Sequence, residues 1–172
     1  MSFMAIERVF KVLEAKPKIV DKENAQELKT INSEITFENV TFEYIKNTPV
    51  LKNLNLNIKK GETLALVGNS GGGKSTTVSL LPRFYDIKKG EIKIDGINIK
   101  DYTLKSLRDN IVVVFQDNFL FSGTIRENIL LGNPKATEGD IKKALEMAFL
   151  DEFVATLQDG LDTQIGERGM LL

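Results

Sequence analysis

One glycine-rich stretch, Thr63 to Thr76, constrains the fold of this chain more than any other. It consists of a short apolar run, a loop that reads Gly-Asn-Ser-Gly-Gly-Gly-Lys-Ser-Thr, and the start of a helix-forming segment. The loop fits the phosphate-binding pattern G-x-x-x-x-G-K-[ST], with Gly68, Gly73, Lys74 and Ser75 at the fixed positions. The stretch therefore predicts a strand, a phosphate-binding loop and a helix, in that order.

Each residue type in this loop has a physical role in binding phosphate. Glycines let the backbone wrap closely round a phosphate and adopt positive φ without a Cβ clash. Successive N–H groups from about Gly71 to Thr76 would point inward, beside the positive end of the helix dipole. We expect Lys74 to reach the β- and γ-phosphates, Ser75 to bind Mg²⁺ and Thr76 to reach the α-phosphate. The predicted nucleoside triphosphate site comprises Gly68, Asn69, Ser70, Gly71, Gly72, Gly73, Lys74, Ser75 and Thr76.

A glycine-rich turn with an exposed lysine is the alternative interpretation of this loop. The flanking sequence argues against it, because Leu64 to Val67 form the buried-strand run that the motif needs upstream. Downstream, Val78, Leu80 and Leu81 provide the apolar side of a helix. The motif is specific in this strand–loop–helix setting, so we favour nucleotide binding.

The composition limits the chemistry that the 172 residues can perform. A hydrophobic content of 42% and a charged content of 27% are typical of a soluble globular domain. Zero cysteines and zero histidines exclude thiolate and imidazole chemistry, so a metal ion must be bound by oxygen, which suits Mg²⁺. The net charge of −1 gives no electrostatic case for nucleic-acid binding. No segment approaches the roughly 18 apolar residues of a membrane-spanning helix, and no signal peptide is evident, which predicts a soluble cytosolic segment.

The residues before the phosphate loop predict a helix, a linker and two strands. Apolar residues at helical spacing in 1–14 form one stripe, Pro17 stops the helix, and 16–30 is polar like a linker. Alternation from Glu34 to Tyr44 changes phase near Glu38–Asn39, which predicts a β-bulge. The following strand alternates asparagines with apolar residues, as a half-exposed strand does: Asn53, Leu54, Asn55, Leu56, Asn57 and Ile58.

The residues after the loop predict further elements of an α/β domain. We expect a helix over 75–84, a turn at Lys89–Gly90 and a hairpin over 91–99 with an Asp95-Gly96 turn. A short helix around 104–108 leads to a second buried strand, 111–115.

The last third of the chain predicts a helical segment. A capping box at Thr124–Glu127 opens one helix, a second runs from Thr137 to Phe149, and Asp151 caps a third.

Together these residues resemble the nucleotide-binding domain of ABC transporters of the exporter type. Phe42-Glu43-Tyr44 is similar to the A-loop, whose aromatic ring stacks on adenine in that family. Val114-Phe115-Gln116-Asp117 is similar to the Q-loop, which implies that Gln116 coordinates Mg²⁺ and approaches the attacking water. Phe121 to Ile129 is a phrase typical of exporters, and Gly166 to Gly169 resembles the loop before the signature motif. A core aromatic remains the alternative for Tyr44, and a polar strand end for Gln116.

The resemblance implies an α/β fold: a P-loop NTPase with an incomplete RecA-like core, an antiparallel β subdomain and a helical subdomain. It implies a connector helix and linker over 1–30, an ATP-binding core over 31–118 and a helical subdomain over 119–172. The ligands would be ATP and Mg²⁺, with Lys74 and Gln116 catalytic and Ser75 and Gln116 as metal ligands. The partners would be a transmembrane domain and a second nucleotide-binding domain, head to tail, at the cytoplasmic face of the membrane.

The sequence departs from the family pattern at its end. The signature motif would begin at Leu171-Leu172, and the Walker B aspartate, the catalytic glutamate and the switch histidine do not occur in these residues. We therefore expect the 172-residue chain alone to bind nucleotide weakly and to hydrolyse it hardly at all. In the family the Walker B strand lies beside the phosphate-loop strand, so we also expect an unpaired edge at 63–67. Two explanations are open: the chain associates with itself, or it is truncated relative to a natural protein.

Two other functions remain open from the sequence. One is a non-catalytic nucleotide-binding regulatory module, which residues after Leu172 would distinguish. The other is a P-loop kinase or GTPase, which predicts an acceptor-binding lid or a guanine-reading Asn-Lys-x-Asp motif, and neither occurs here.

Overall fold

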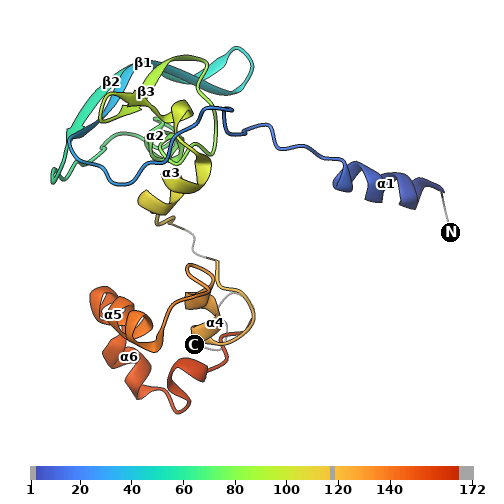
Figure 1. Ribbon diagram of the computed structural model, residues 1–172, viewed down its shortest axis with the longest axis vertical. Coiled ribbons are helices and arrows are strands. Elements are labelled where there is room, and N and C mark those ends of the chain that lie inside the picture. The colour runs from blue at the N-terminus through green and yellow to red at the C-terminus, as the bar shows by residue number, and fades with distance from the viewer. Residues whose placement is uncertain (1–2, 117–118, 167–172) are drawn as a thin grey trace. The chain divides into compact units, whose positions relative to one another are not determined.

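The computed structural model describes residues 3–116 and 119–166, which belong to two compact units (Figure 1). The first unit spans 1–113 and the second 114–172. The finer division into 1–30, 31–118 and 119–172 stays a prediction.

The first unit contains one antiparallel sheet with the strand order β2-β1-β3-β4. The antiparallel β subdomain inferred from the resemblance is therefore present. The elements in chain order are α1 (Phe3–Leu13), β1 (Glu34–Ile45), β2 (Thr48–Lys59), α2 (Lys74–Leu80), β3 (Lys89–Ile94), β4 (Ile97–Asn98), a 3₁₀ turn (Ile99–Asp101) and α3 (Leu104–Asn110).

The central strand β1 carries the bulge that its hydrophobic pattern predicts. Its pairing with β2 shifts between Phe37 and Val40, and Asn39 adopts φ +50°. Gly90 of β3 lies so close to this point that a Cβ would collide with the carbonyl oxygens of Glu38 and Asn39. The bulge returns Val40 to the core face, where it is fully buried.

One face of the sheet is covered by α2 and α3 (Figure 1). The strand residues that alternate with the core include exposed polar side chains such as Glu38, Asn55 and Asn57. Leu80 of α2 and Leu107 of α3 are fully buried. They pack with the buried strand residues Phe37, Val40, Phe42, Leu51, Ile92 and Ile94. The exposed asparagines of β2 confirm the prediction of a half-exposed strand.

Part of the polar segment before β1 packs against α3. Leu28 is buried, its N–H donates to the Ser106 hydroxyl at 2.9 Å, and its carbonyl accepts from the Asn110 amide at 2.8 Å. A single apolar side chain in polar surroundings has no periodicity, so the sequence pattern did not indicate this contact.

Two apolar runs predicted as buried strands, 63–67 and 111–115, form no strand. Every residue of 63–67 is exposed, with Val67 at 91%, and Val112 reaches 87%. A strand exists only when a neighbour completes its ladder of hydrogen bonds, and neither run pairs with any part of the chain that the structure describes. Both strand predictions are wrong for this structure, because hydrophobicity indicates a capacity to pair and does not supply the partner.

Three boundaries also differ from the prediction. α2 ends at Leu80 and not at Phe84, because the chain turns through Pro82 and through Arg83 at φ +54°. Lys89 and Gly90 begin β3 and do not form a turn. The Asp95-Gly96 turn is confirmed, with φ +51° and +81°.

The second unit is helical, as predicted. It contains α4 (Ile125–Leu130), α5 (Glu138–Ala148), α6 (Asp151–Thr156) and a 3₁₀ turn (Gly160–Asp162), which pack around Ile141, Leu145 and Val154. Thr124 and Thr137 both form capping boxes. Asp151 is the first residue of α6 and does not cap it, since the N-cap is Leu150 without a side-chain hydrogen bond.

No helix within residues 3–116 or 119–166 is long and apolar enough to cross a bilayer.

Candidate functional site

The phosphate loop is organised around Lys74. The Lys74 ammonium donates hydrogen bonds to the carbonyl oxygens of Gly68 at 2.9 Å and Asn69 at 2.8 Å. Gly71 and Gly73 adopt positive φ of 79° and 85°, which a side chain would disfavour. The loop thus turns back on itself, as the glycine spacing predicts, and the lysine closes it.

The first turn of α2 sits directly on β2. A Cβ at Gly73 would come 2.6 Å from Leu51 Cδ2 and 3.4 Å from the Val50 carbonyl oxygen. The Thr77 hydroxyl and N–H both bond the Gly73 carbonyl, at 2.9 and 2.8 Å. Gly73 is therefore required by both the backbone and the packing, and the sequence alone indicated only the first reason.

Tyr44, near the end of β1, reaches the predicted phosphate ligand Thr76. Its hydroxyl donates a hydrogen bond to Thr76 Oγ1 at 3.1 Å. Thr76 is buried, whereas the Tyr44 side chain is 51% exposed and so offers ring surface to a ligand. Residues predicted to contact the base and the phosphates thus meet, although they come from distant parts of the sequence.

Two further aromatic rings adjoin Tyr44. Phe42 lies 4.8 Å and Tyr85 5.1 Å from it between ring centroids, both edge to face. The cluster borders an open hollow of about 700 Å³. Tyr85 could not be identified from the sequence, because it follows α2 in an irregular turn where no periodicity marks it.

For the remaining predicted site residues that it describes, the structure gives exposure but no side-chain hydrogen bond with the rest of the site. Ser75 is exposed in the first turn of α2. Gln116 is exposed in the second unit, so its position relative to the phosphate loop stays a prediction. Asp117 of the Q-loop phrase, and residues 167–169 of the loop before the signature motif, lie outside the described residues.

The oxygen ligands near the phosphate loop fit a magnesium ion only if a bound nucleotide supplies further oxygens. Among the residues that the structure describes, no group of three His, Cys, Asp or Glu side chains could hold a metal ion. The Ser75 hydroxyl is a hard oxygen ligand of the kind Mg²⁺ accepts, and Mg²⁺ is usually bound through few protein groups plus phosphates.

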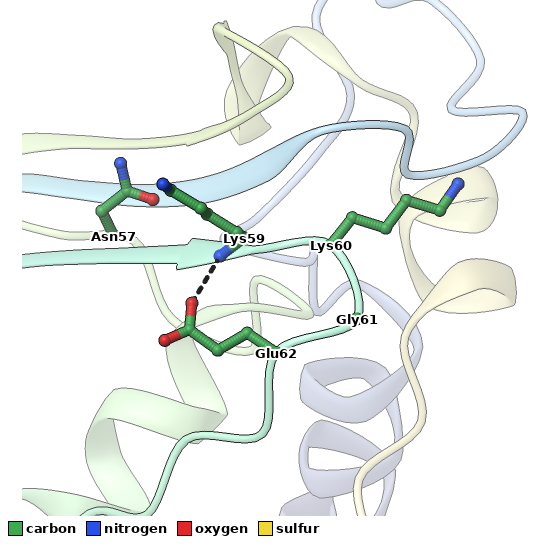
Figure 2. Close-up of a pocket in the computed structure, with 5 residues that line it drawn as sticks. All are labelled: Asn57, Lys59, Lys60, Gly61 and Glu62. Atoms are coloured by element: carbon green, nitrogen blue, oxygen red, sulfur yellow. Dashed lines mark hydrogen bonds between the residues drawn. The ribbon is translucent and has the colours of Figure 1, made fainter.

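A second hollow of about 600 Å³ lies at the turn after β2 (Figure 2). The Lys59 N–H donates to Glu62 Oε2 at 2.9 Å and closes the turn. The side chains of Lys59 and Lys60 point in different directions, so they do not converge on one anion (Figure 2). This hollow shares no residue with the phosphate loop, and we assign it no function.

The sequence profile of the ABC transporter family matches residues 51–167. The chain belongs to the ABC transporter family. The match includes the phosphate loop and the Q-loop phrase, and it argues against the kinase and GTPase alternatives. It also identifies the fold as that of a P-loop NTPase.

Similar proteins are exporters or ABC ATP-binding proteins. A protein of Staphylococcus aureus (strain NCTC 8325 / PS 47), named as a multidrug export ATP-binding/permease protein, is 48% identical over 165 residues, which cover 95% of this chain and 28% of that protein. The uncharacterized ABC transporter ATP-binding protein YwjA of Bacillus subtilis (strain 168) is 51% identical over 161 residues, 94% of this chain and 28% of YwjA.

A solved structure of a bacterial Atm1-family ABC exporter with ATP bound has a TM-score of 0.90 and 37% identity. It covers 98% of this chain, which spans 30% of that exporter. The chain is thus a nucleotide-binding domain of the ABC exporter type, and it spans less than a third of the length of these relatives.

Proposed function

We propose that this ABC domain binds ATP and, within a larger exporter, couples ATP binding and hydrolysis to transport across a membrane. The observation that carries the proposal is the hydrogen bond between Tyr44 and Thr76, which joins the predicted base and phosphate contacts in one site. The names of the relatives, ATP-binding/permease protein and ABC exporter, support the transport role.

Each predicted residue has a role in this site. The half-exposed ring of Tyr44 stacks on adenine, and Lys74 exchanges its two carbonyl partners for the β- and γ-phosphates. Ser75 would offer its hydroxyl oxygen and Gln116 its amide oxygen to Mg²⁺, and the ion would neutralise charge on the phosphates. Lys74 would stabilise charge in phosphoryl transfer, and Gln116 would orient the attacking water.

The proposed partners are a transmembrane domain and a second nucleotide-binding domain, placing the domain at the cytoplasmic face of a membrane. Phosphoryl transfer depends on positioning and on charge stabilisation around the γ-phosphate. The sequence places no candidate general base beside the phosphate loop, so the 172-residue chain alone binds ATP with little turnover.

Calorimetric titration of the 172-residue chain with ATP and Mg²⁺ tests the binding proposal. We expect measurable binding, weakened about tenfold or more by Lys74→Ala, because a charge-assisted contact to phosphate is removed. Lys60→Ala, in the turn after β2, is the matched control and should bind like the wild type. The proposal is wrong if the wild type does not bind ATP, or if Lys74→Ala binds ATP as tightly as Lys60→Ala does.

Steady-state phosphate release tests the claim about turnover. We expect a rate close to the background without protein. Sustained turnover that Lys74→Ala abolishes would contradict this claim and leave the binding proposal intact.

A further inference from the structure

Tyr85 packs on the ring that we assign to the nucleotide base. The Tyr44 and Tyr85 rings lie 5.1 Å apart at 88°, and Tyr85 also lies 5.7 Å from Phe42. Edge-to-face aromatic pairs at such distances contribute stabilisation beyond the area that they bury. Phe42 is fixed in the core, but Tyr85 is 44% exposed, so its contact with Tyr44 is not explained by core packing alone.

Arg108 of α3 fixes the backbone that carries Tyr85. Its guanidinium donates to the carbonyl oxygens of Pro82 at 3.1 Å and Arg83 at 3.2 Å. The same group lies 5.6 Å from the centroid of the Phe84 ring, within the range of a cation–π contact. The three residues before Tyr85 are therefore held by one side chain of a neighbouring helix.

Arg83 holds this segment from the other direction. It is buried at 4% exposure, and its Nε donates to Asp86 Oδ1 at 2.9 Å. Its Nη2 donates to the Val20 carbonyl at 3.3 Å. Tyr85 lies between Arg83 and Asp86, so its backbone is fixed on both sides although its side chain reaches solvent.

The hydrogen bond to Thr76 cannot orient the Tyr44 ring by itself. A bond at the hydroxyl fixes the tip of the side chain, whereas stacking on a base requires a fixed ring plane. Tyr44 and Tyr85 both line the open hollow of about 700 Å³. Contacts along the ring edge or face are what restrict rotation of the ring, and Tyr85 provides one.

We infer that Tyr85 is a positioning residue for nucleobase binding, which holds the Tyr44 ring in the plane that stacks on the base while Tyr44 bonds Thr76. The inference rests on the proposed ATP site and adds a residue that does not contact the phosphates. Tyr85 acts on the base half of the ligand only, and it acts through Tyr44.

Two ligands separate this role from a general effect on folding. ATP uses both halves of the site, whereas inorganic tripolyphosphate uses the phosphate loop alone. In calorimetric titrations with Mg²⁺, we expect Tyr85→Leu to weaken ATP binding about three- to tenfold and to leave tripolyphosphate binding unchanged. Tyr85→Phe keeps the ring and should restore ATP binding.

A double-mutant cycle tests whether Tyr85 acts through Tyr44. In a Tyr44→Leu background, Tyr85→Leu should cause no further loss of ATP affinity, because the ring that it positions is gone. Additive losses, an unchanged ATP affinity of Tyr85→Leu, or equal losses for both ligands would overturn the inference. A wild-type chain that binds tripolyphosphate but not ATP would refute the proposed function itself, whereas wild-type ATP binding that Tyr85→Leu leaves intact would refute only this inference.

Discussion

At Gly73 the backbone conformation and the packing of α2 on β2 both require the absence of a side chain. Its φ of +85° is costly for any residue with a Cβ, and an added Cβ would press on the buried Leu51 at 2.6 Å. Gly61 provides a contrast, since its φ is +80° but no atom lies within 4 Å of an added Cβ. The two glycines separate conformational strain from crowding.

Gly73→Ala is expected to lower both stability and ATP affinity. Strain alone costs about 1–2 kcal/mol, and displacement of Leu51 adds to it and moves the start of α2. Gly61→Ala should lose only the stability that the strained backbone costs, and its ATP affinity should be unchanged. Urea unfolding followed by tyrosine fluorescence, together with ATP titration, checks both variants. If Gly73→Ala and Gly61→Ala lose the same stability and the same ATP affinity, crowding at Gly73 has no effect.

The carboxylate of Asp95, in the turn between β3 and β4, adds hydrogen bonds to the backbone at the start of β1. Asp95 Oδ1 and Oδ2 accept hydrogen bonds from the backbone N–H groups of Asn32, Ser33 and Glu34 at 2.7 to 3.0 Å. Burial alone would raise the pKa of Asp95, but these donors outweigh it and hold the pKa below the ordinary value of 3.8. Asp95 thus serves both as a turn residue and as a clamp between elements.

Asp95→Asn is expected to destabilise the first unit by about 1–3 kcal/mol at neutral pH, because an amide replaces an acceptor of charge-assisted bonds. A lowered folded-state pKa means that this stabilisation is complete above pH 3.8 and is lost as the pH falls from there toward the folded-state value. The difference between wild type and variant should therefore shrink in acid. All three tyrosines lie in the first unit, so tyrosine fluorescence during urea unfolding reports on it. A difference that stays constant down to about pH 3 would contradict the clamp.

Local signals were sufficient to predict several elements. The phase change near Asn39 predicted the bulge, Asp95-Gly96 predicted the turn, and Thr124 predicted a capping box; each depends on a few neighbouring residues. The A-loop interpretation of Tyr44 depended on the resemblance, and its contact with Thr76 could not be read from spacing, because it joins β1 to α2.

Features that depend on distant partners were not predicted from the sequence. Leu28 is buried by α3, and Tyr85 packs on Tyr44, but neither residue belongs to a periodic pattern. The runs 63–67 and 111–115 show the opposite error, because each has the composition of a strand but no neighbour in the described structure. Composition determines what a segment can pair with, and tertiary structure determines whether it does.

At the scale of the whole molecule, these two runs leave unpaired backbone and apolar side chains in solvent. Val67, Val112 and Val114 are 91%, 87% and 82% exposed. Exposed segments rich in β-branched residues favour pairing between chains. A domain of this family with such segments uncovered is therefore expected to associate with itself in solution.

Light scattering of the 172-residue chain over a range of concentrations checks this expectation. We expect the average mass to rise with concentration, and Val67→Lys and Val112→Lys each to lower it, because a charge opposes strand pairing. Ile45→Lys is the matched control, since it adds the same charge at an aliphatic residue that is 71% exposed but outside both runs. A monomeric wild type, or an equal effect of Ile45→Lys, would show that the unpaired runs do not drive association. Val67→Lys and Val112→Lys should also leave ATP affinity unchanged. That result would show that they act on the association between chains and not on the nucleotide site.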